Sequence, residues 1–123
     1  MKRIVSALKK EKSYRDFLKT YAERKGKRFP ILVSGLSEGA IAAFYTAILS
    51  DLVIKKNALP ALCILPTEKE CARLCAMMND YHVRAVTYTV RDMVFQNIVA
   101  SHEFEHERLA TLDAILTGKC DIV

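Results

Sequence analysis

Apolar residues follow two patterns along the chain. Continuous runs of apolar or small residues occupy 31–34 and 58–65, residues 83–88 alternate, and a further apolar run starts at Cys120. Runs of this kind are typical of short strands, and the first two are typical of strands buried on both faces. Between them, apolar residues recur at steps of three and four, which predicts helices. The alternation predicts an α/β fold with three layers, in which helices flank a mostly parallel sheet.

Capping and stop signals predict where the helices begin and end. Thr67 and Glu70 form a capping box, in which the hydroxyl and the carboxylate satisfy each other's backbone donors. Ser37 and Ser101 are placed to begin two other helices, and Gly118 is placed to end the last one. We also expect a short helix at 2–10, a helix from Ser13 to near Gly26, and a loop with a turn of helix at 90–100.

The stretch from Ile31 to Ala43 contains the one loop that resembles a known cofactor site. It reads strand, tight turn, helix, which is how a phosphate-binding loop of the form G-x-x-x-x-G-K-[ST] is built. Gly35 matches the first glycine of that form. At the positions of the second glycine, the lysine and the hydroxyl residue, this sequence has Ala40, Ile41 and Ala42.

This loop is therefore predicted to be vestigial. A hydrocarbon at position 41 leaves the negative charge of a triphosphate uncompensated, and the methyl group of alanine 40 crowds a tight turn. We expect no cofactor, no ATP binding and no catalysis at the loop residues Gly35, Ser37, Gly39, Ala40, Ile41 and Ala42. The expected domain is an incomplete fold of the P-loop or RecA-like class, truncated at its C-terminus. A functional nucleotide-binding fragment of the helicase type is the alternative.

Charge divides the chain near residue 29. Residues 1–29 hold eleven Lys or Arg and three acids, an excess of eight positive charges, whereas the whole chain has a net charge of +5. We therefore expect a basic amphipathic helical region at 1–29, followed by the α/β domain at 30–123. The basic region either contacts DNA or is a solvated helix face.

Size and cysteine content are typical of a cytoplasmic protein. The chain of 123 residues suits one domain, and no apolar run reaches the roughly 20 residues that span a bilayer, so no membrane partner is expected. The four cysteines form no C-x-x-C pair, which favours free buried thiols over a metal or redox site. A truncated sheet would leave an open edge that can pair between copies.

Residues 102–106 match the zinc-protease pattern H-E-x-x-H. In that pattern His102 and His106 would bind zinc from consecutive helical turns, while Glu103 would serve as the base. Charged neighbours such as Glu105 differ from the apolar surroundings of such a helix, and the sequence offers no clear third ligand. A zinc hydrolase is therefore the weaker alternative, and surface metal binding by the two histidines is favoured over catalysis.

Three stretches in order resemble the N-terminal part of the bacterial transcription-repair coupling factors, the Mfd family. They are G-L-S-E-G-A-I-A-A from Gly35, L-C-I-L-P-T-E-K-E-C-A-R-L from Leu62, and V-A-S-H-E-F-E-H-E-R-L from Val99. The first resembles a family pattern G-L-[TS]-x-x-A. The third resembles V-A-S-x-E-x-x-x-x-R-L, in which both histidines fall on variable positions. The resemblance covers residues 31–123.

The resemblance implies a function that the residues alone do not indicate. The first module of this family is similar to domain 1a of the excision-repair helicase UvrB, with its phosphate loop degenerate. The full-length protein is expected to be an ATP-dependent DNA translocase that removes stalled RNA polymerase and recruits UvrA. This chain is then expected to be a non-catalytic, UvrB-like scaffold on the recruiting and regulatory side, with the motor in other domains.

Overall fold

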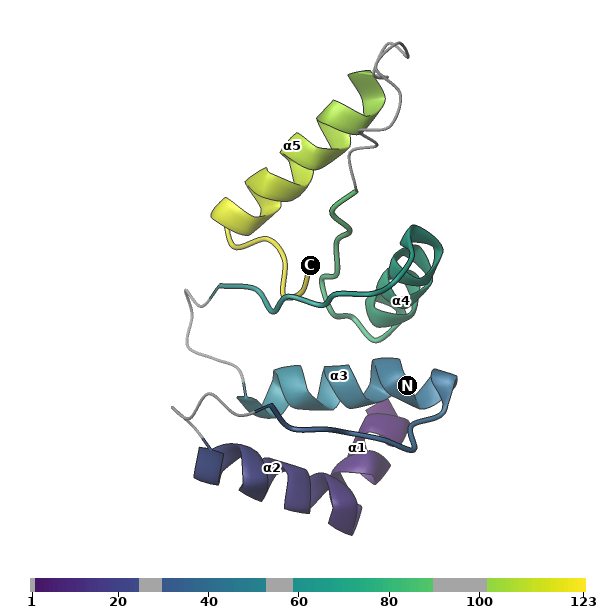
Figure 1. Ribbon diagram of the computed structural model, residues 1–123, viewed down its shortest axis with the longest axis vertical. Helices are drawn as coiled ribbons and strands as arrows, with labels where there is room; N and C mark the ends of the chain where they lie inside the picture. Colours follow the sequence, from purple (N-terminus) through teal and green to yellow (C-terminus); the bar gives the residue numbers. More distant parts are fainter. Residues whose placement is uncertain (1, 25–29, 53–58, 90–101) are drawn as a thin grey trace. The chain divides into compact units, whose positions relative to one another are not determined.

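Helices dominate the computed structural model, which describes residues 2–24, 30–52, 59–89 and 102–123 (Figure 1). The described helices are α1 (Lys2–Lys10), α2 (Lys12–Arg24), α3 (Glu38–Leu52), α4 (Glu68–Asp80) and α5 (His102–Leu116). Each lies where the spacing of apolar residues predicts a helix, so these predicted helices are confirmed. The predicted loop at 90–100 lies outside the described residues. The chain forms two compact units, Met1–Leu52 and Val53–Val123.

The predicted three-layer, mostly parallel sheet is wrong. In the part of the chain that the structure describes, extended segments meet only in two isolated parallel bridges, from Ile122 to Ala61 and to Ala85. Residues 31–34 are extended but join no bridge to another described residue. A strand is buried on both faces only when it has neighbours on both edges and helices on both sides. Among the described residues, the apolar segment at 59–65 has a neighbouring segment on one edge only. Its Leu62 and Ile64 side chains are accordingly 76% and 84% exposed. The fold is therefore helical and not an α/β domain of the P-loop or RecA-like class.

The first unit is built around an aromatic core shared by its three helices. Tyr14 of α2 is buried together with Phe44 and Ala47 of α3. The Phe44 ring meets Tyr14 edge to face with centroids 6.0 Å apart, and it meets Phe17 with centroids 5.3 Å apart. Edge-to-face ring pairs add to the free energy gained by burying apolar area. The half-buried residues around this core are Val5, Leu8, Phe17, Leu18, Leu36, Tyr45 and Ile48.

The two helices of the second unit have well-defined ends. Thr67 caps α4, because its Oγ1 accepts the Glu70 N–H at 3.2 Å, as the sequence predicts. At the end of α5, the Gly118 N–H donates to the Ile115 carbonyl (3.3 Å) and the Lys119 N–H donates to the Ala114 carbonyl (2.8 Å). Gly118 has φ +66°, the left-handed conformation that this ending requires. The predicted stop at Gly118 is confirmed.

The C-terminal residues lie between two extended segments of the second unit. On one side, the Ala61 N–H donates to the Asp121 carbonyl at 3.0 Å and the Val123 N–H donates to the Ala61 carbonyl at 2.9 Å. On the other side, the Val86 N–H donates to the Ile122 carbonyl at 3.1 Å. The buried apolar residues of this unit gather around the same place; they are Met78, Val83, Ala85, Cys120 and Ile122.

Candidate functional site

The loop that the sequence predicts to be a vestigial phosphate loop lies between residues 31–34 and α3. Gly35 has φ +82°, so the sharp turn predicted at this glycine is present. The Ala40 N–H donates to the Ser37 carbonyl at 2.9 Å, which places Ser37 at the start of α3. A side chain at Gly39 would meet no atom within 4 Å, so this glycine is not required by close packing. The backbone thus turns from an extended segment into a helix, without a sheet behind it.

At positions 40, 41 and 42 of this loop the side chains carry neither a charge nor a hydroxyl group. Gly35, Ser37 and Gly39 are exposed, whereas Ala40 and Ile41 are half-buried. Ala42, which occupies the position of the magnesium-binding hydroxyl residue, is 0% exposed and belongs to the buried side of α3. Ala40, Ile41 and Ala42 all lie in the first turns of α3.

The H-E-x-x-H stretch forms the first turns of α5, which begins at His102. The side chains of His102 and Glu103 lie outside the described residues, and His106 is exposed. His82, the remaining histidine, is exposed in the turn after α4. Across the described ranges, no three His, Cys, Asp or Glu side chains are grouped so that they could hold a metal ion.

The four cysteines are free thiols, and burial suppresses the reactivity of two of them. Cys75 lies half-buried on α4, and its Sγ donates to the Ala85 carbonyl at 3.3 Å. Burial raises the pKa of the Cys75 thiol, and burial also raises the pKa of Cys120. Because the thiolate is the nucleophile, both thiols are less nucleophilic at neutral pH than an exposed cysteine.

A polar cluster that the sequence did not indicate joins the three helices of the first unit. Asp51 of α3 forms an ion pair with Lys9 of α1 and accepts a hydrogen bond from the Tyr14 hydroxyl of α2 at 2.8 Å. Burial by itself would raise the pKa of Asp51, but the hydrogen bonds from Lys9 and Tyr14 outweigh it and lower that pKa. Burial first, and then the hydrogen bond to Asp51, raise the pKa of Tyr14 well above its ordinary value. Asp51 is therefore ionised and Tyr14 neutral at physiological pH.

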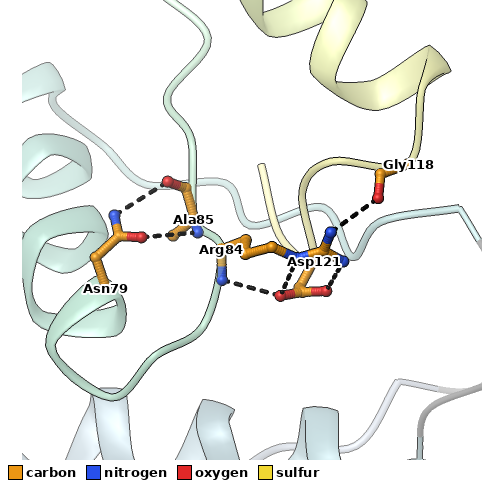
Figure 2. A network of polar contacts seen from close by, with 5 residues as sticks. All are labelled: Asn79, Arg84, Ala85, Gly118 and Asp121. Atoms are coloured by element: carbon orange, nitrogen blue, oxygen red, sulfur yellow. Dashed lines mark hydrogen bonds and ion pairs between the residues drawn. The ribbon is translucent and has the colours of Figure 1, made fainter.

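A second polar cluster fixes the C-terminal residues in the other unit (Figure 2). Asp121 Oδ2 accepts hydrogen bonds from the Arg84 backbone N–H at 2.9 Å and from the Arg84 Nε at 3.1 Å. Asp121 Oδ1 accepts a hydrogen bond from the Arg84 Nη2 at 2.5 Å. The remaining arm of the guanidinium donates to the Gly118 carbonyl at 3.0 Å. Hydrogen bonds from Arg84 lower the pKa of Asp121. The paired, fork-shaped contact fixes the direction in which the chain leaves α5.

Asn79 of α4 binds the backbone of the segment that follows it (Figure 2). Its Nδ2 donates to the Ala85 carbonyl at 3.1 Å, and its Oδ1 accepts the Ala85 N–H at 3.3 Å. A side-chain amide has the same donor and acceptor as a peptide group, so Asn79 takes the place of a neighbouring strand at this residue. The cluster is structural, because every group in it is bound to another group of the chain.

Comparisons with known proteins gave no match for this chain, whether among family models, curated proteins or solved structures. None of the described helices has both the length and the apolar character that crossing a bilayer requires.

The side chains that the structure brings together differ from those that the sequence singled out. The loop residues were recognisable from glycine spacing, and the structure places Gly35 and Ser37 in the turn before α3 and Gly39 to Ala42 within α3. Lys9, Tyr14 and Asp51 were not recognisable, because Lys9 and Asp51 are 42 positions apart in the sequence. One usable signal was Tyr14 itself, since a tyrosine in an apolar helix stripe requires a partner for its hydroxyl when it is buried.

Proposed function

We propose that this chain is a non-catalytic interaction module of a bacterial transcription-repair coupling factor. In this proposal it acts in the cytoplasm, in the region that recruits UvrA and regulates the DNA translocase, and RNA polymerase is the other partner of the full-length protein. The three sequence stretches in family order support the assignment. The helical fold replaces the α/β architecture that the resemblance implies, so the proposal concerns the role and not a UvrB-like sheet.

The burial of Ala42 carries the non-catalytic part of the proposal. In a working phosphate loop this position exposes a hydroxyl to magnesium, and the position before it extends a lysine to the phosphates. Here the methyl group of Ala42 is fully enclosed in the core, and Ile41 is a half-buried hydrocarbon. The same burial argues against the alternative of a functional nucleotide-binding fragment.

Calorimetric titration with Mg-ATP tests this part directly. We expect no heat of binding at about millimolar nucleotide and no shift of the melting temperature, because a ligand stabilises only a fold that binds it. The double variant Ile41→Lys/Ala42→Ser introduces the lysine and the hydroxyl group of a phosphate loop; because position 42 is enclosed in the core, it should show no heat of binding either. If the wild-type chain bound ATP and Gly35→Val abolished the binding, the chain would be a nucleotide-binding protein and the proposal would be wrong.

A second experiment tests the family assignment. The coding sequence beyond residue 123 should encode a motor with an intact G-x-x-x-x-G-K-[ST] loop, and the full-length protein should co-purify with UvrA and RNA polymerase. Deleting residues 1–123 should then change the recruitment of UvrA or the basal translocase rate. A coding sequence without any such motor would remove the assignment, whatever the result of the ATP titration.

A further inference from the structure

The helices α1 and α2 of the first unit carry exposed basic side chains that form no ion pair with another described residue. Lys9, which lies between them in the sequence, is instead bound by Asp51. We call this set the basic face; it comprises Lys2, Arg3 and Lys10 of α1 and Lys12, Arg15 and Lys19 of α2.

Helix geometry places most of these cations on the sides that point away from the core. At about 100° per residue, Lys12, Arg15 and Lys19 lie on one side of α2, opposite to Tyr14 and Phe17. Arg3 and Lys10 share one side of α1 in the same way. Their positions are opposite to Val5 and Leu8, which pack against the aromatic core.

The unbalanced charge of the basic face comes from α1. α1 contains no acidic residue, whereas each cation of α2 has an acid four positions away along the chain, as in Lys12 and Asp16, Arg15 and Glu11, and Lys19 and Glu23. Six cations against three acids leave an excess of three positive charges. Lys12 and Arg15 also lie in the first turn of α2, where the helix dipole favours acids, so these cations do not stabilise the helix. A cationic surface with this excess attracts a polyanion.

We propose that the basic face binds the phosphate backbone of duplex DNA without reading its sequence. Cations that meet only phosphates position a protein on DNA but carry no sequence information. Single strands are bound largely by stacking of bases on aromatic rings, and the ring of Tyr21 lies on the other side of α2, against Phe17 at 6.4 Å between centroids. A membrane surface fits less well, because Val5 and Leu8 are packed in the core and Ile4 is the one large apolar side chain of α1 that is exposed. This contact goes beyond the proposed function, which depends on the loop before α3.

Fluorescence anisotropy with a labelled duplex of about 20 base pairs tests the proposal. Between about 50 and 200 mM KCl, the logarithm of the affinity should fall linearly with the logarithm of the salt concentration, with a slope of about −3 to −5. The variant Lys12→Gln/Arg15→Gln/Lys19→Gln should bind at least about tenfold more weakly, with a slope shallower by about 2 to 3. Arg3→Gln/Lys10→Gln provides a second, independent variant, and circular dichroism checks that both stay folded.

The matched control changes the same charge in the second unit. Lys69→Gln/Arg73→Gln/Lys119→Gln also removes three positive charges and should leave the affinity within about twofold. Equal weakening by this control would show that net charge alone is responsible and would overturn the proposal. Tighter binding to single-stranded DNA or to polyglutamate than to the duplex would overturn it as well, as would an absence of duplex binding at about 50 mM KCl. None of these results depends on whether the chain binds ATP.

Discussion

The Tyr14 hydroxyl donates a hydrogen bond to Asp51 Oδ2 over 2.8 Å, and this contact joins α2 to the end of α3. The other carboxylate oxygen of Asp51, Oδ1, forms an ion pair with Lys9, which is the penultimate residue of α1. A single carboxylate therefore holds all three helices of the first unit. Because the Tyr14 ring is buried beside Phe44, its hydroxyl has to find a partner within the fold.

Replacing Tyr14 with phenylalanine should destabilise the first unit. Tyr14→Phe keeps the ring in the aromatic core but removes the hydrogen bond to an ionised carboxylate, so the free energy of unfolding should fall by about 1–2 kcal/mol. Urea unfolding measures this change in the free energy of unfolding, with hydrogen exchange of the α3 amides as the signal that reports on the first unit. Tyr21→Phe is the control, since that ring is partly exposed, and it should change the free energy by less than about 0.5 kcal/mol. Equal effects of the two variants would contradict the role given to Asp51.

The raised pKa of Tyr14 predicts a loss of stability at alkaline pH. The folded chain holds the phenolic proton more tightly than the unfolded chain, whose tyrosines ionise near pH 10. Stability from this group is therefore complete below about pH 10 and is lost as the pH rises above it. Melting temperatures of the wild type and of Tyr14→Phe should begin to converge above about pH 10 and should approach each other further as the pH rises. Parallel curves over that range would show that Tyr14 does not titrate abnormally.

The helices were predictable because their signals are local. Thr67 and Glu70 are three positions apart, and the spacing of Tyr14 and Phe17 marks a helix stripe without knowledge of the rest of the chain. Gly118 was recognisable as a stop for the same reason, since a left-handed residue at a helix end favours glycine.

The sheet could not be predicted correctly, because a strand depends on partners that are distant in sequence. The apolar run at 58–65 is compatible with a buried strand, but Leu62 and Ile64 are exposed, because among the described residues the segment 59–65 has a neighbour on one edge only. The same limit applies to the polar clusters. Arg84 and Asp121 are 37 positions apart, and neither is preceded by a pattern that would pair them. The loop before α3 differs from the sheet and the polar clusters, because its deviation from the phosphate-loop pattern at positions 40 to 42 can be read directly from the sequence.

Removing the Asn79 amide should loosen the segment that it binds. Asn79→Leu removes the amide donor of the Ala85 carbonyl, and this buried group then keeps the weak hydrogen bond from the Cys75 thiol in its place. The expected loss in the free energy of unfolding is about 1–3 kcal/mol, together with faster hydrogen exchange of the Ala85 and Val86 amides. Asn79→Asp keeps an acceptor but no donor, so it should lose nearly as much. Asp80→Asn, at the next and exposed position, should leave both measurements unchanged.

His82 ends α4 in a conformation that suits glycine better than histidine. Its φ of +62° lies in the left-handed region, and the Val83 N–H donates past it to the Met78 carbonyl at 3.1 Å, as in the ending of α5 at Gly118. A β-carbon in this region costs about 1–2 kcal/mol, while glycine adds a smaller entropic cost through the unfolded chain. His82→Gly should therefore raise the free energy of unfolding by about 0.5–1 kcal/mol.

The alanine variant separates the backbone effect from the loss of the imidazole ring. His82→Ala removes the ring but keeps the β-carbon, so it should give no gain in chemical denaturation. The corresponding change at the end of α5, Gly118→Ala, introduces a β-carbon at φ +66° and should cost about 1 kcal/mol or more. If His82→Ala stabilised the chain as much as His82→Gly, the ring and not the backbone would be the source of the strain, and the two helix ends would not be equivalent.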